Sequence, residues 1–509
     1  MKFKIVYNSL LNENRELLNH FRRIVLSFVL LLPLCSNSQT LSRLNTISEL
    51  NIGESKKIVL TNGESVNLLL KDVSIDRDSL RGAVRNASVT VEVDGKEITI
   101  SSGNYQLPIK VGKIRIDCPV VKEFTVSSYY RHDGDLAKDA RLRLWPGDSP
   151  CIQPGTFGFP LQQAFMASRT QSQNEMAGLG WAENLQSTNA GYHAPHDFGG
   201  AEGMDEIFAA TDGLVVSSKK EVLEGYEDLP GDVRPDVVWV VDGRGWYYRY
   251  SHLNSIEPEI SPGAKIKLGQ KIGYMGKQGG SGGWVHLHFG VHHKNRETGK
   301  WEVEDAFPYL WEAYVKKYGL KVKAIARPRL IAWTNQEIAL DGSKSVGMEG
   351  DIVSYEWTFT DGSKATGPVQ KRTYETAGEY SEILRVTDSR GNVDYDFAYI
   401  QVFDRQFPDK QIPTIHPAFY PTLNIKADDP VTFLVRTFGS LSGEETWDFG
   451  DGTEKVAVNS GVVERQTQND GKYAETVHTF SKPGHYVVRV ERKNESGFPA
   501  IGHLHVKIN

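Results

Sequence analysis

The sequence has few cysteines and no long hydrophobic segment beyond its N-terminal region, and both absences narrow the class of protein. Three cysteines among 509 residues exclude a disulfide-dense scaffold and a cysteine-rich zinc finger. No segment after residue 38 is apolar over the roughly 20 residues that a membrane helix needs. The 58 Lys and Arg residues nearly balance 64 Asp and Glu, and they form no basic stripe, which argues against a nucleic-acid partner.

Common catalytic signatures are also absent. The sequence contains no H-E-x-x-H motif and no G-x-S-x-G motif, which excludes a helix-borne zinc peptidase and a serine hydrolase with a nucleophile elbow. Gly276-Lys277 resembles part of a phosphate-binding loop, but Lys271 stands where that motif needs glycine and Gln278 where it needs serine or threonine.

The composition that remains is that of a folded, multidomain β protein. Hydrophobic residues make up 39% of the chain, and its 48 glycines favour a structure rich in turns. At about 150 residues per domain, the length predicts about three or four domains. We therefore expect a mainly β, multidomain protein.

The N-terminal residues predict export. Arg22 and Arg23 precede an apolar run over 24–34, which is too short to span a bilayer and has the order of a secretory signal. We expect residues 1–38 to be a signal peptide, with cleavage after Ser38. A lipoprotein signal ending at Cys35 fits less well, because Leu34 stands where a small residue is expected. The predicted location is the periplasm, the cell envelope or the extracellular space.

Two blocks follow the signal. In residues 45–128, Val89, Val91 and Val93 alternate in the manner of a strand, and the sequence 94–95 (Asp-Gly) predicts a hairpin turn. This block is a small β domain without a recognisable chemical motif. Residues 150–318 form a glycine-rich β block that ends in a predicted helix over 305–318. The apolar residues of that helix recur at helical spacing: Phe307, Leu310, Trp311 and Tyr314.

The last two blocks repeat one pattern. A strand carrying Trp357 and Phe359 runs into an Asp-Gly turn, and the same arrangement recurs at Trp447 and Phe449 within the sequence W-x-F-G-D-G-T. Both copies resemble polycystic-kidney-disease (PKD) repeats, which implies immunoglobulin-like β-sandwiches over 322–403 and 420–508, joined by a proline-rich linker over 404–419. We interpret both tryptophans as core residues. The repeats are expected to hold the protein near a surface polymer.

Histidine and aspartate motifs concentrate in the glycine-rich block. His193 and Asp197 form an H-x-x-x-D pattern, and His286 and His288 form an H-x-H pattern within an apolar run. Because side chains two apart on a strand share a face, His286 and His288 can point into one cleft. His252 ends an aromatic strand between the two motifs. A zinc hydrolase needs such nitrogen and oxygen ligands to converge while one coordination position stays open.

Together with their filler residues, these motifs resemble the lysostaphin-type (LytM-like) zinc metallopeptidases. The matching segments beside the two motifs are 207–216, 261–273 and the glycine-rich stretch 279–284, all within 191–293. The resemblance implies a glycine-rich antiparallel β-sheet peptidase core. It also implies zinc as the cofactor, with His193, Asp197 and His288 as ligands. His286 would deprotonate the attacking water, and His252 would orient water or stabilise the oxyanion.

Four further histidines have no role in that resemblance. His196 is interpreted as a residue that either supports the metal ligands from behind or lies at the rim of the site. His292 and His293 are expected in a surface turn and His478 in a structural position. The acidic segment 221–236 interrupts the resemblance, and we interpret it as a solvated loop, with a substrate-selecting cleft wall as the alternative. The poorly matched segment 131–190 leaves a latent, covered enzyme open.

Two functions follow from the sequence. The first is an exported zinc endopeptidase that hydrolyses peptidoglycan cross-bridges or stem peptides, with a glycine-rich extracellular protein as a second substrate class. The second is a non-catalytic binding or regulatory module with a peptidase-like fold. The first is favoured because non-catalytic relatives usually lose ligands, and none is lost here. An oxidising compartment also makes Cys118 and Cys151 a candidate disulfide.

Overall fold

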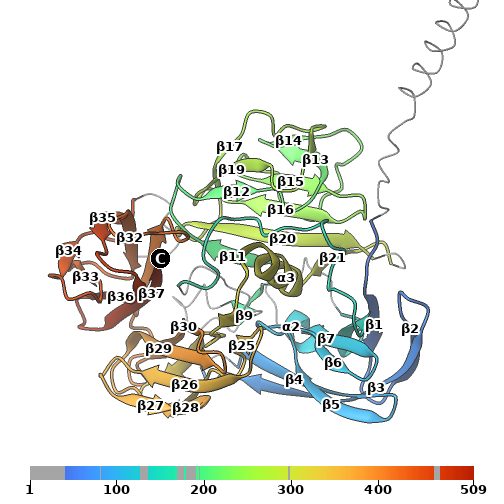
Figure 1. Ribbon diagram of the computed structural model, residues 1–509, viewed down its shortest axis with the longest axis horizontal. Helices are drawn as coiled ribbons and strands as arrows, with labels where there is room; N and C mark the ends of the chain where they lie inside the picture. Colours follow the sequence, from blue (N-terminus) through green and yellow to red (C-terminus); the bar gives the residue numbers. More distant parts are fainter. Residues whose placement is uncertain are drawn as a thin grey trace, which may run out of the picture. The chain divides into compact units, whose positions relative to one another are not determined.

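Strands dominate the part of the chain that the computed structural model describes, which confirms the mainly β class (Figure 1). The described residues are 41–80, 82–126, 136–168, 177–178, 191–193, 195–295, 298–463 and 471–509. The predicted signal peptide, with Cys35, lies outside them. Residues Ser42–Asn509 form one unit. None of the described helices is long and apolar enough to cross a membrane.

The first block contains two antiparallel sheets. One has the order β2-β3-β4-β5 and the other β1-β8-β7-β6, with the short helix α2 (Lys122–Val126) after β7. Their strands are β1 (Thr46–Leu50), β2 (Ser55–Val59), β3 (Ser65–Arg77), β4 (Val84–Val93), β5 (Lys96–Ser101), β6 (Ile109–Val111), β7 (Ile114–Val121) and β8 (Ala140–Pro146).

The predicted hairpin lies between β4 and β5. Asp94 and Gly95 occupy its turn with φ values of 46° and 85°, a left-handed conformation that suits an Asp-Gly turn. The valines that alternate along β4 are buried as expected, since Val89 and Val91 are both 0% exposed. One boundary differs from the prediction. Strand β8, beyond residue 128, pairs with both β1 and β7 and therefore belongs to this block.

The second block is built on an antiparallel sheet whose strands differ in length and follow the order β11-β20-β16-β15-β13-β14. Its strands are β11 (His196–Gly199), β13 (Gly213–Ser218), β14 (Glu221–Val222), β15 (Val238–Val241), β16 (Tyr247–Ser251) and β20 (His286–Lys294), with β18 (Lys265–Ile266) beside β13 and β21 (Trp301–Glu304) beside β20. A smaller sheet contains β12 (Glu206–Phe208), β19 (Lys271–Met275) and β17 (Leu253–Ile256), and β9 (Ala177–Gly178) pairs with β10 (Gly191–Tyr192).

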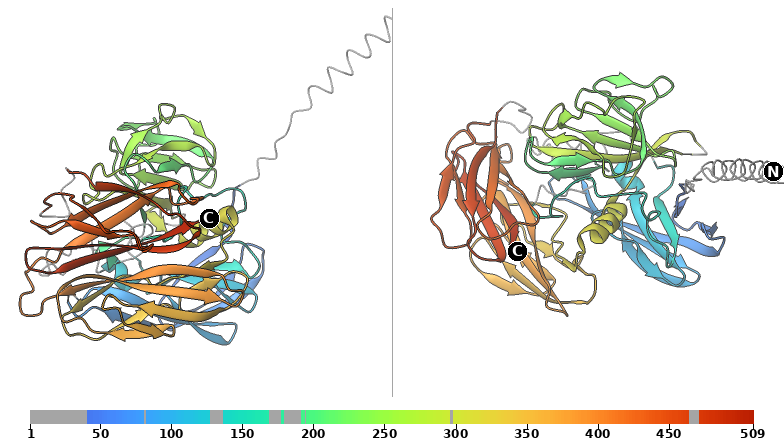
Figure 2. Two further views of the ribbon diagram at one scale, coloured as in Figure 1. Left: turned by 60° about the vertical axis from the view of Figure 1, so that its left-hand side comes forward. Right: turned by 45° about the horizontal axis from the view of Figure 1, so that its top comes forward.

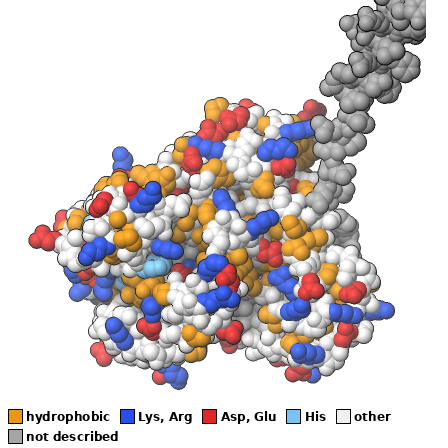
Figure 3. Space-filling model, in the orientation of Figure 1, with side chains coloured by type: hydrophobic (Ala, Val, Ile, Leu, Met, Phe, Trp, Pro, Cys, Tyr) orange, Lys and Arg blue, Asp and Glu red, His pale blue; other side chains and the backbone are white. Residues whose placement is uncertain are grey.

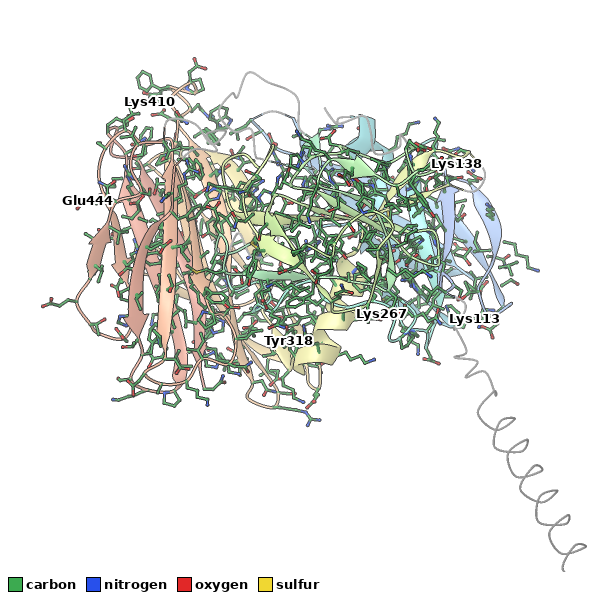
Figure 4. All side chains as sticks on the ribbon, turned by 90° about the horizontal axis from the view of Figure 1, so that it is seen from above. Lys113, Lys138, Lys267, Tyr318, Lys410 and Glu444 are labelled. Atoms are coloured by element: carbon green, nitrogen blue, oxygen red, sulfur yellow. The ribbon has the colours of Figure 1, made fainter. Side chains whose placement is uncertain are left out.

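Helix α3 (Phe307–Tyr318) closes this block, as predicted (Figure 2). Its apolar stripe is buried, and Phe307 and Leu310 join a core cluster that also contains residues of the sheet. Gly319, with φ 62°, ends the helix, and its N–H donates to the carbonyl of Val315. Tyr318, labelled in Figure 4, donates its hydroxyl hydrogen to the carbonyl of Leu161 at 3.3 Å.

A buried ionic network joins the first block to the second. Arg143 on β8 is 1% exposed and lies 2.6 Å from Asp117 on β7 and 2.7 Å from Glu304 on β21. Because an unpaired charge at such a site is costly, this network fixes one edge of the sheet of the second block against the N-terminal strands.

The remaining chain forms two β-sandwich units. The first contains β22 (Val322–Lys323), β23 (Leu330–Trp333), β24 (Ile338–Asp341), β25 (Val346–Gly347), β26 (Ile352–Thr358), β27 (Lys364–Thr366), β28 (Val369–Arg372), β29 (Gly378–Asp388) and β30 (Val393–Phe403). The second, which we call the C-terminal sandwich, contains β31 (Thr414–Tyr420), β32 (Pro430–Phe438), β33 (Glu445–Asp448), β34 (Val456–Val458), β35 (Ala474–Thr479), β36 (Gly484–Lys493) and β37 (Pro499–Ile508).

The two units share the pattern that the sequence repeats. Trp357 on β26 and Trp447 on β33 are 1% and 0% exposed, which confirms both as core residues. Each carrying strand pairs with a long strand that in turn pairs with its neighbour, β29 with β30 and β36 with β37. The predicted linker is shorter than expected, because residues 414–420 form strand β31 and pair with β32.

Candidate metal centre

The pairing of β11 with β20 brings the two sequence motifs together. In this antiparallel register Asp197 lies opposite His288, and Gly199 lies opposite His286. Leu287 and Phe289 point into the core and are fully covered, so the alternating residues His286 and His288 point to the other face of the sheet. The H-x-H pattern therefore places both imidazoles on one face, as expected.

The three residues that the resemblance implies as ligands lie in mutual contact. Asp197 Oδ1 is 3.0 Å from His288 Nδ1, and Asp197 Oδ2 is 3.4 Å from His193 Nε2. The two imidazole nitrogens are 3.3 Å apart. Side-chain exposure falls from 28% at His193 to 12% at Asp197, so the cluster is open on the side of His193. Two imidazoles and a carboxylate are a donor set that suits zinc.

A second set of ligands meets the same distance condition. His252, His286 and His288 also each offer a nitrogen within 4.8 Å of the others, as do His193, Asp197 and His288. The two sets share His288, whose buried Nε2 has no hydrogen-bond partner among the described residues. A carboxylate in the first set offsets the charge of a divalent ion, whereas the second set is neutral. The distances allow either set of residues to bind a metal ion. The negative charge of Asp197 favours the set of His193, Asp197 and His288.

His286 is held in one orientation by Trp284. The two rings stack with centroids 3.8 Å apart at an interplanar angle of 14°, and His286 Nδ1 lies 3.1 Å from the Trp284 carbonyl oxygen. Because a carbonyl only accepts hydrogen bonds, Nδ1 carries the hydrogen and Nε2 keeps a free lone pair. Nε2 lies 3.8 Å from Asp197 Oδ1. Burial lowers the pKa of His286 well below its usual value, so the imidazole is neutral at pH 7.

His252 faces the same cluster from a strained backbone position between β16 and β17. Its φ is 67°, a left-handed conformation that is uncommon for a residue other than glycine and that clusters at functional sites. Its ring centroid is 4.6 Å from that of His286. His252 Nδ1 donates to the Gln278 carbonyl oxygen at 2.6 Å, which leaves Nε2 as the nitrogen that can act on a ligand.

Asp236 supports His252, a role that the sequence analysis missed. Its Oδ2 accepts a hydrogen bond from the His252 backbone N–H at 3.1 Å and lies 3.6 Å from His252 Nδ1. Arg234 holds the same carboxylate through two hydrogen bonds, of 2.9 and 3.0 Å. Burial alone would raise the pKa of Asp236, but the hydrogen bonds from His252 and Arg234 outweigh it and keep the pKa below its usual value.

Replacing Asp236 by asparagine should therefore reduce activity without removing the metal. Asparagine keeps the shape of the side chain but loses the charge that faces His252 and Arg234. We expect kcat/KM to fall about 10–100-fold, the range typical of an outer contact that orients a site residue. Steady-state kinetics and zinc content measure the two effects. An unchanged kcat/KM would show that Asp236 does not contribute to the site.

The rest of the acidic segment 221–236 behaves as the predicted solvated loop. Its other acidic side chains are exposed: Glu221, Glu224, Glu227, Asp228 and Asp232. Asp228 pairs with Lys294 and accepts a hydrogen bond from the Trp301 indole at 3.0 Å. Asp236, 5% exposed, is the exception, because it ends the loop beside β15 rather than in solvent.

Three histidines differ from their predicted positions. His196 is 1% exposed and stacks on Phe307 in the core, on the face of β11 opposite to Asp197, so its interpretation as a rim residue is wrong. The surface turn expected at His292 and His293 is also wrong, since both lie in β20 and are 3% and 6% exposed. The additional strand β21 covers this end of β20, and His293 Nε2 contacts Glu304 at 3.2 Å.

The two remaining cysteines are separate in this structure. Cys118 and Cys151 are both buried free thiols, and they belong to different core clusters, so the candidate disulfide is not formed. Burial raises the pKa of the Cys118 thiol to about 12, which makes it unreactive near pH 7.

Asp205 anchors the loop that follows β11 and gives it a pH-dependent stability. It is 3% exposed, and its Oδ2 accepts a hydrogen bond from the Ala201 N–H at 2.7 Å. Burial raises its pKa to about 7, although the hydrogen bond opposes this. The folded protein therefore keeps a proton that the unfolded chain releases above about pH 4. The contribution of this group is fully present below about pH 4 and is lost as the pH rises to about 7.

Replacing Asp205 by asparagine should remove that loss of stability, because the amide oxygen still accepts the Ala201 hydrogen bond. We expect the variant to exceed the wild type in free energy of unfolding by about 1–4 kcal/mol at pH 8 and to differ little at pH 4. Urea unfolding at both pH values measures this difference. The exposed variant Asp232→Asn is the control, and an equal pH dependence in Asp205→Asn and wild type would contradict the assignment.

The surface in the view of Figure 3 carries both signs of charge. Red and blue side chains are interspersed over all the visible blocks, without a continuous field of one sign.

Two known families match the chain in the order that the sequence predicts. Residues 191–299 match peptidase family M23, and residues 323–402 match the PKD domain. M23 is the family of the lysostaphin-type peptidases. The matched residues 191–299 include both histidine motifs and His252. The predicted order of a lysostaphin-type peptidase region followed by a PKD repeat is confirmed over these residues.

Individual relatives match more weakly. Collagenase ColA of Clostridium perfringens (strain 13 / Type A) is 29% identical over 123 residues, which cover 24% of this chain and 11% of that protein. The chain therefore spans about a tenth of the length of this relative. Helicobacter pylori Csd3 in a hexagonal crystal is 14% identical, with a TM-score of 0.18 over 48% of this chain and 80% of that chain. The fibronectin(III)-like modules of Clostridium thermocellum CbhA are 12% identical, with a TM-score of 0.14 over 37% of this chain and 94% of theirs.

Proposed function

We propose that the chain is an exported zinc-dependent endopeptidase whose centre is formed by His193, Asp197 and His288, with His286 and His252 as catalytic residues. The observation that carries this proposal is the register of β11 and β20, which sets Asp197 opposite His288 and brings three zinc-type donors together. The match of residues 191–299 to a peptidase family supports the reaction class. Three protein ligands leave a coordination position for water, as a hydrolytic site requires.

The neutral imidazole of His286 is suited to act as the general base. Its Nε2 has a free lone pair and points to the proposed ligands His193, Asp197 and His288. It can therefore take a proton from the attacking water and return it to the leaving amine. Zinc at this site would polarise the scissile carbonyl and lower the pKa of the attacking water. His252 would orient that water or stabilise the charge on the carbonyl oxygen, and Asp236, 3.6 Å from His252 Nδ1, would help to hold the ring in place.

The proposed substrates are the peptides of peptidoglycan, cleaved within a cross-bridge or stem peptide. A glycine-rich extracellular protein is the second substrate class, and the partial match to a protein named as a collagenase is consistent with it. We further propose that residues 1–38 are a signal peptide and that 420–508 form a second PKD repeat. The support for the second repeat is that Trp447 is buried in the same way as Trp357. Both repeats would hold the enzyme near an insoluble polymer.

Lysis of purified cell-wall sacculi tests this function. The purified protein should reduce the turbidity of a sacculus suspension, lose this activity with a chelator and regain it when zinc is added back. A protein that binds zinc tightly but cleaves neither a sacculus nor a glycine-rich peptide would instead be a binding or regulatory module with a peptidase-like fold.

A further inference from the structure

The three residues that precede His286 contact the C-terminal sandwich. Arg436 Nη1 donates a hydrogen bond of 2.7 Å to the Gly283 carbonyl oxygen, and the Val285 N–H donates one of 3.2 Å to the Tyr473 hydroxyl. Between them, the rings of Trp284 and His416 lie with their centroids 5.6 Å apart. Segment 283–285 is thus tied at each residue to a part of the chain more than 130 positions later.

Strand β32 presents these contacts through the alternation of its side chains. Val431, Phe433 and Val435 point into the core of the C-terminal sandwich. Arg436 and Phe438 lie on the other face and are nevertheless 0% and 1% exposed. Gly283 and Trp284 of the second block cover part of that face, together with Val463 of the sandwich itself.

Phe438 packs against Trp284 from outside the sheet of the second block, and Arg436 holds the preceding residue, Gly283. Phe438 forms a separate apolar cluster with Trp284 and Val463, apart from the core of the sandwich. The buried guanidinium of Arg436 lies over the Phe438 ring at 4.9 Å and uses Nη1 for the Gly283 carbonyl. A buried cation is retained only where such acceptors satisfy it, so the geometry of this contact is specific.

Trp284 transmits this contact to His286. One face of the indole stacks on the imidazole at 3.8 Å, and the Trp284 carbonyl accepts the hydrogen of His286 Nδ1. The stack and the hydrogen bond together fix the side-chain torsions of His286 and aim Nε2 at the cluster. Without the indole, the imidazole would rest on a gap and would sample other rotamers.

We propose that Trp284 is a positioning residue for the general base and that the C-terminal sandwich is a structural part of the active centre. This inference rests on the proposed function, in which His286 takes the proton. Arg436, Phe438 and Tyr473 fix segment 283–285, and Trp284 in turn fixes the imidazole. The sandwich therefore acts on the chemical step as well as on any polymer that it binds.

Substitutions of Trp284 in the purified whole protein test the first half of the proposal. Trp284→Leu keeps an apolar side chain but removes the aromatic stack, and Trp284→Phe keeps an aromatic ring. We expect Trp284→Leu to lower kcat about 10–100-fold, the effect of a misplaced catalytic group, with KM within about twofold and zinc content unchanged. Trp284→Phe should recover most of the lost kcat. Equal kcat in the leucine variant and the wild type, or loss of zinc in proportion to activity, would overturn it.

Tyr473→Phe tests the second half with a readout that does not need activity. It removes one hydroxyl group from the C-terminal sandwich and with it the acceptor for the Val285 N–H. We expect faster hydrogen exchange in the peptide containing Val285 and a lower kcat, while Val477→Ser, at a side chain 61% exposed on the same sandwich, should change neither. Unchanged exchange in Tyr473→Phe would show that the contact does not hold the segment. If the wild type cleaves no substrate while exchange still responds, the proposed function fails and the contact stands.

Discussion

Replacing His286 by alanine is expected to abolish most turnover while the protein keeps its zinc. The lone pair of His286 Nε2 points to the cluster and lies 3.8 Å from Asp197 Oδ1, and His286 is outside the ligand set that we assign. Removal of a general base typically costs about 10²–10⁴-fold in rate. The three assigned ligands do not depend on the His286 side chain for their mutual contacts, so the affinity for zinc should change little.

Parallel measurements of kcat and bound zinc in His286→Ala separate the two candidate ligand sets. His485→Gln is the matched control, because His485 is an exposed histidine of the C-terminal sandwich, and we expect it to match the wild type in both measurements. If His286→Ala instead loses zinc together with activity, the ion is held by His252, His286 and His288, and our assignment of the ligands is wrong.

Replacing Asp197 by alanine should have the opposite pattern and remove metal and activity together. Asp197 contributes the single carboxylate of the assigned set, and both of its oxygens contact an imidazole of that set. We expect the zinc affinity to fall by more than the about 10–100-fold that the loss of an outer contact to a metal ligand costs. The charge of the ion would also lose its only negative ligand among the three.

Competition with a chromogenic chelator measures the affinity of Asp197→Ala for zinc. Asp232→Asn removes a carboxylate whose side chain is 70% exposed in the acidic loop, and it should bind zinc as the wild type does. His288→Ala should lose zinc whichever set is correct, because both sets contain it. Normal zinc affinity in Asp197→Ala would show that the carboxylate lies near the ion without binding it.

Local patterns explain how much of this fold could be predicted from the sequence. The Asp94-Gly95 hairpin, helix α3 and the shared face of His286 and His288 all follow from periodicities of two or 3.6 residues and from turn chemistry. Such patterns depend on residues close together in the chain. The same patterns correctly predicted that Trp357 and Trp447 lie in the core.

Contacts between distant segments explain what the sequence did not reveal. In the sequence, Asp236 looks like one more residue of an acidic, solvated loop. Only the fold shows that its carboxylate accepts a hydrogen bond from the His252 backbone N–H. His292 and His293 are polar residues at the end of a strand, and their burial depends on β21, which pairs with them from the next segment. The contact of Trp284 with His416 joins two blocks and has no local signal at all.

Mass analysis of purified muropeptides after digestion tests the central claim most directly. Incubation with the purified protein should give products that have gained one water at a single amide bond. These products should disappear with a chelator, return with zinc and be absent with His286→Ala. Intact muropeptides in the presence of zinc-loaded wild-type protein would contradict peptidoglycan as the substrate. Products that persist in the chelator would contradict a zinc-dependent peptidase centred on His193, Asp197 and His288.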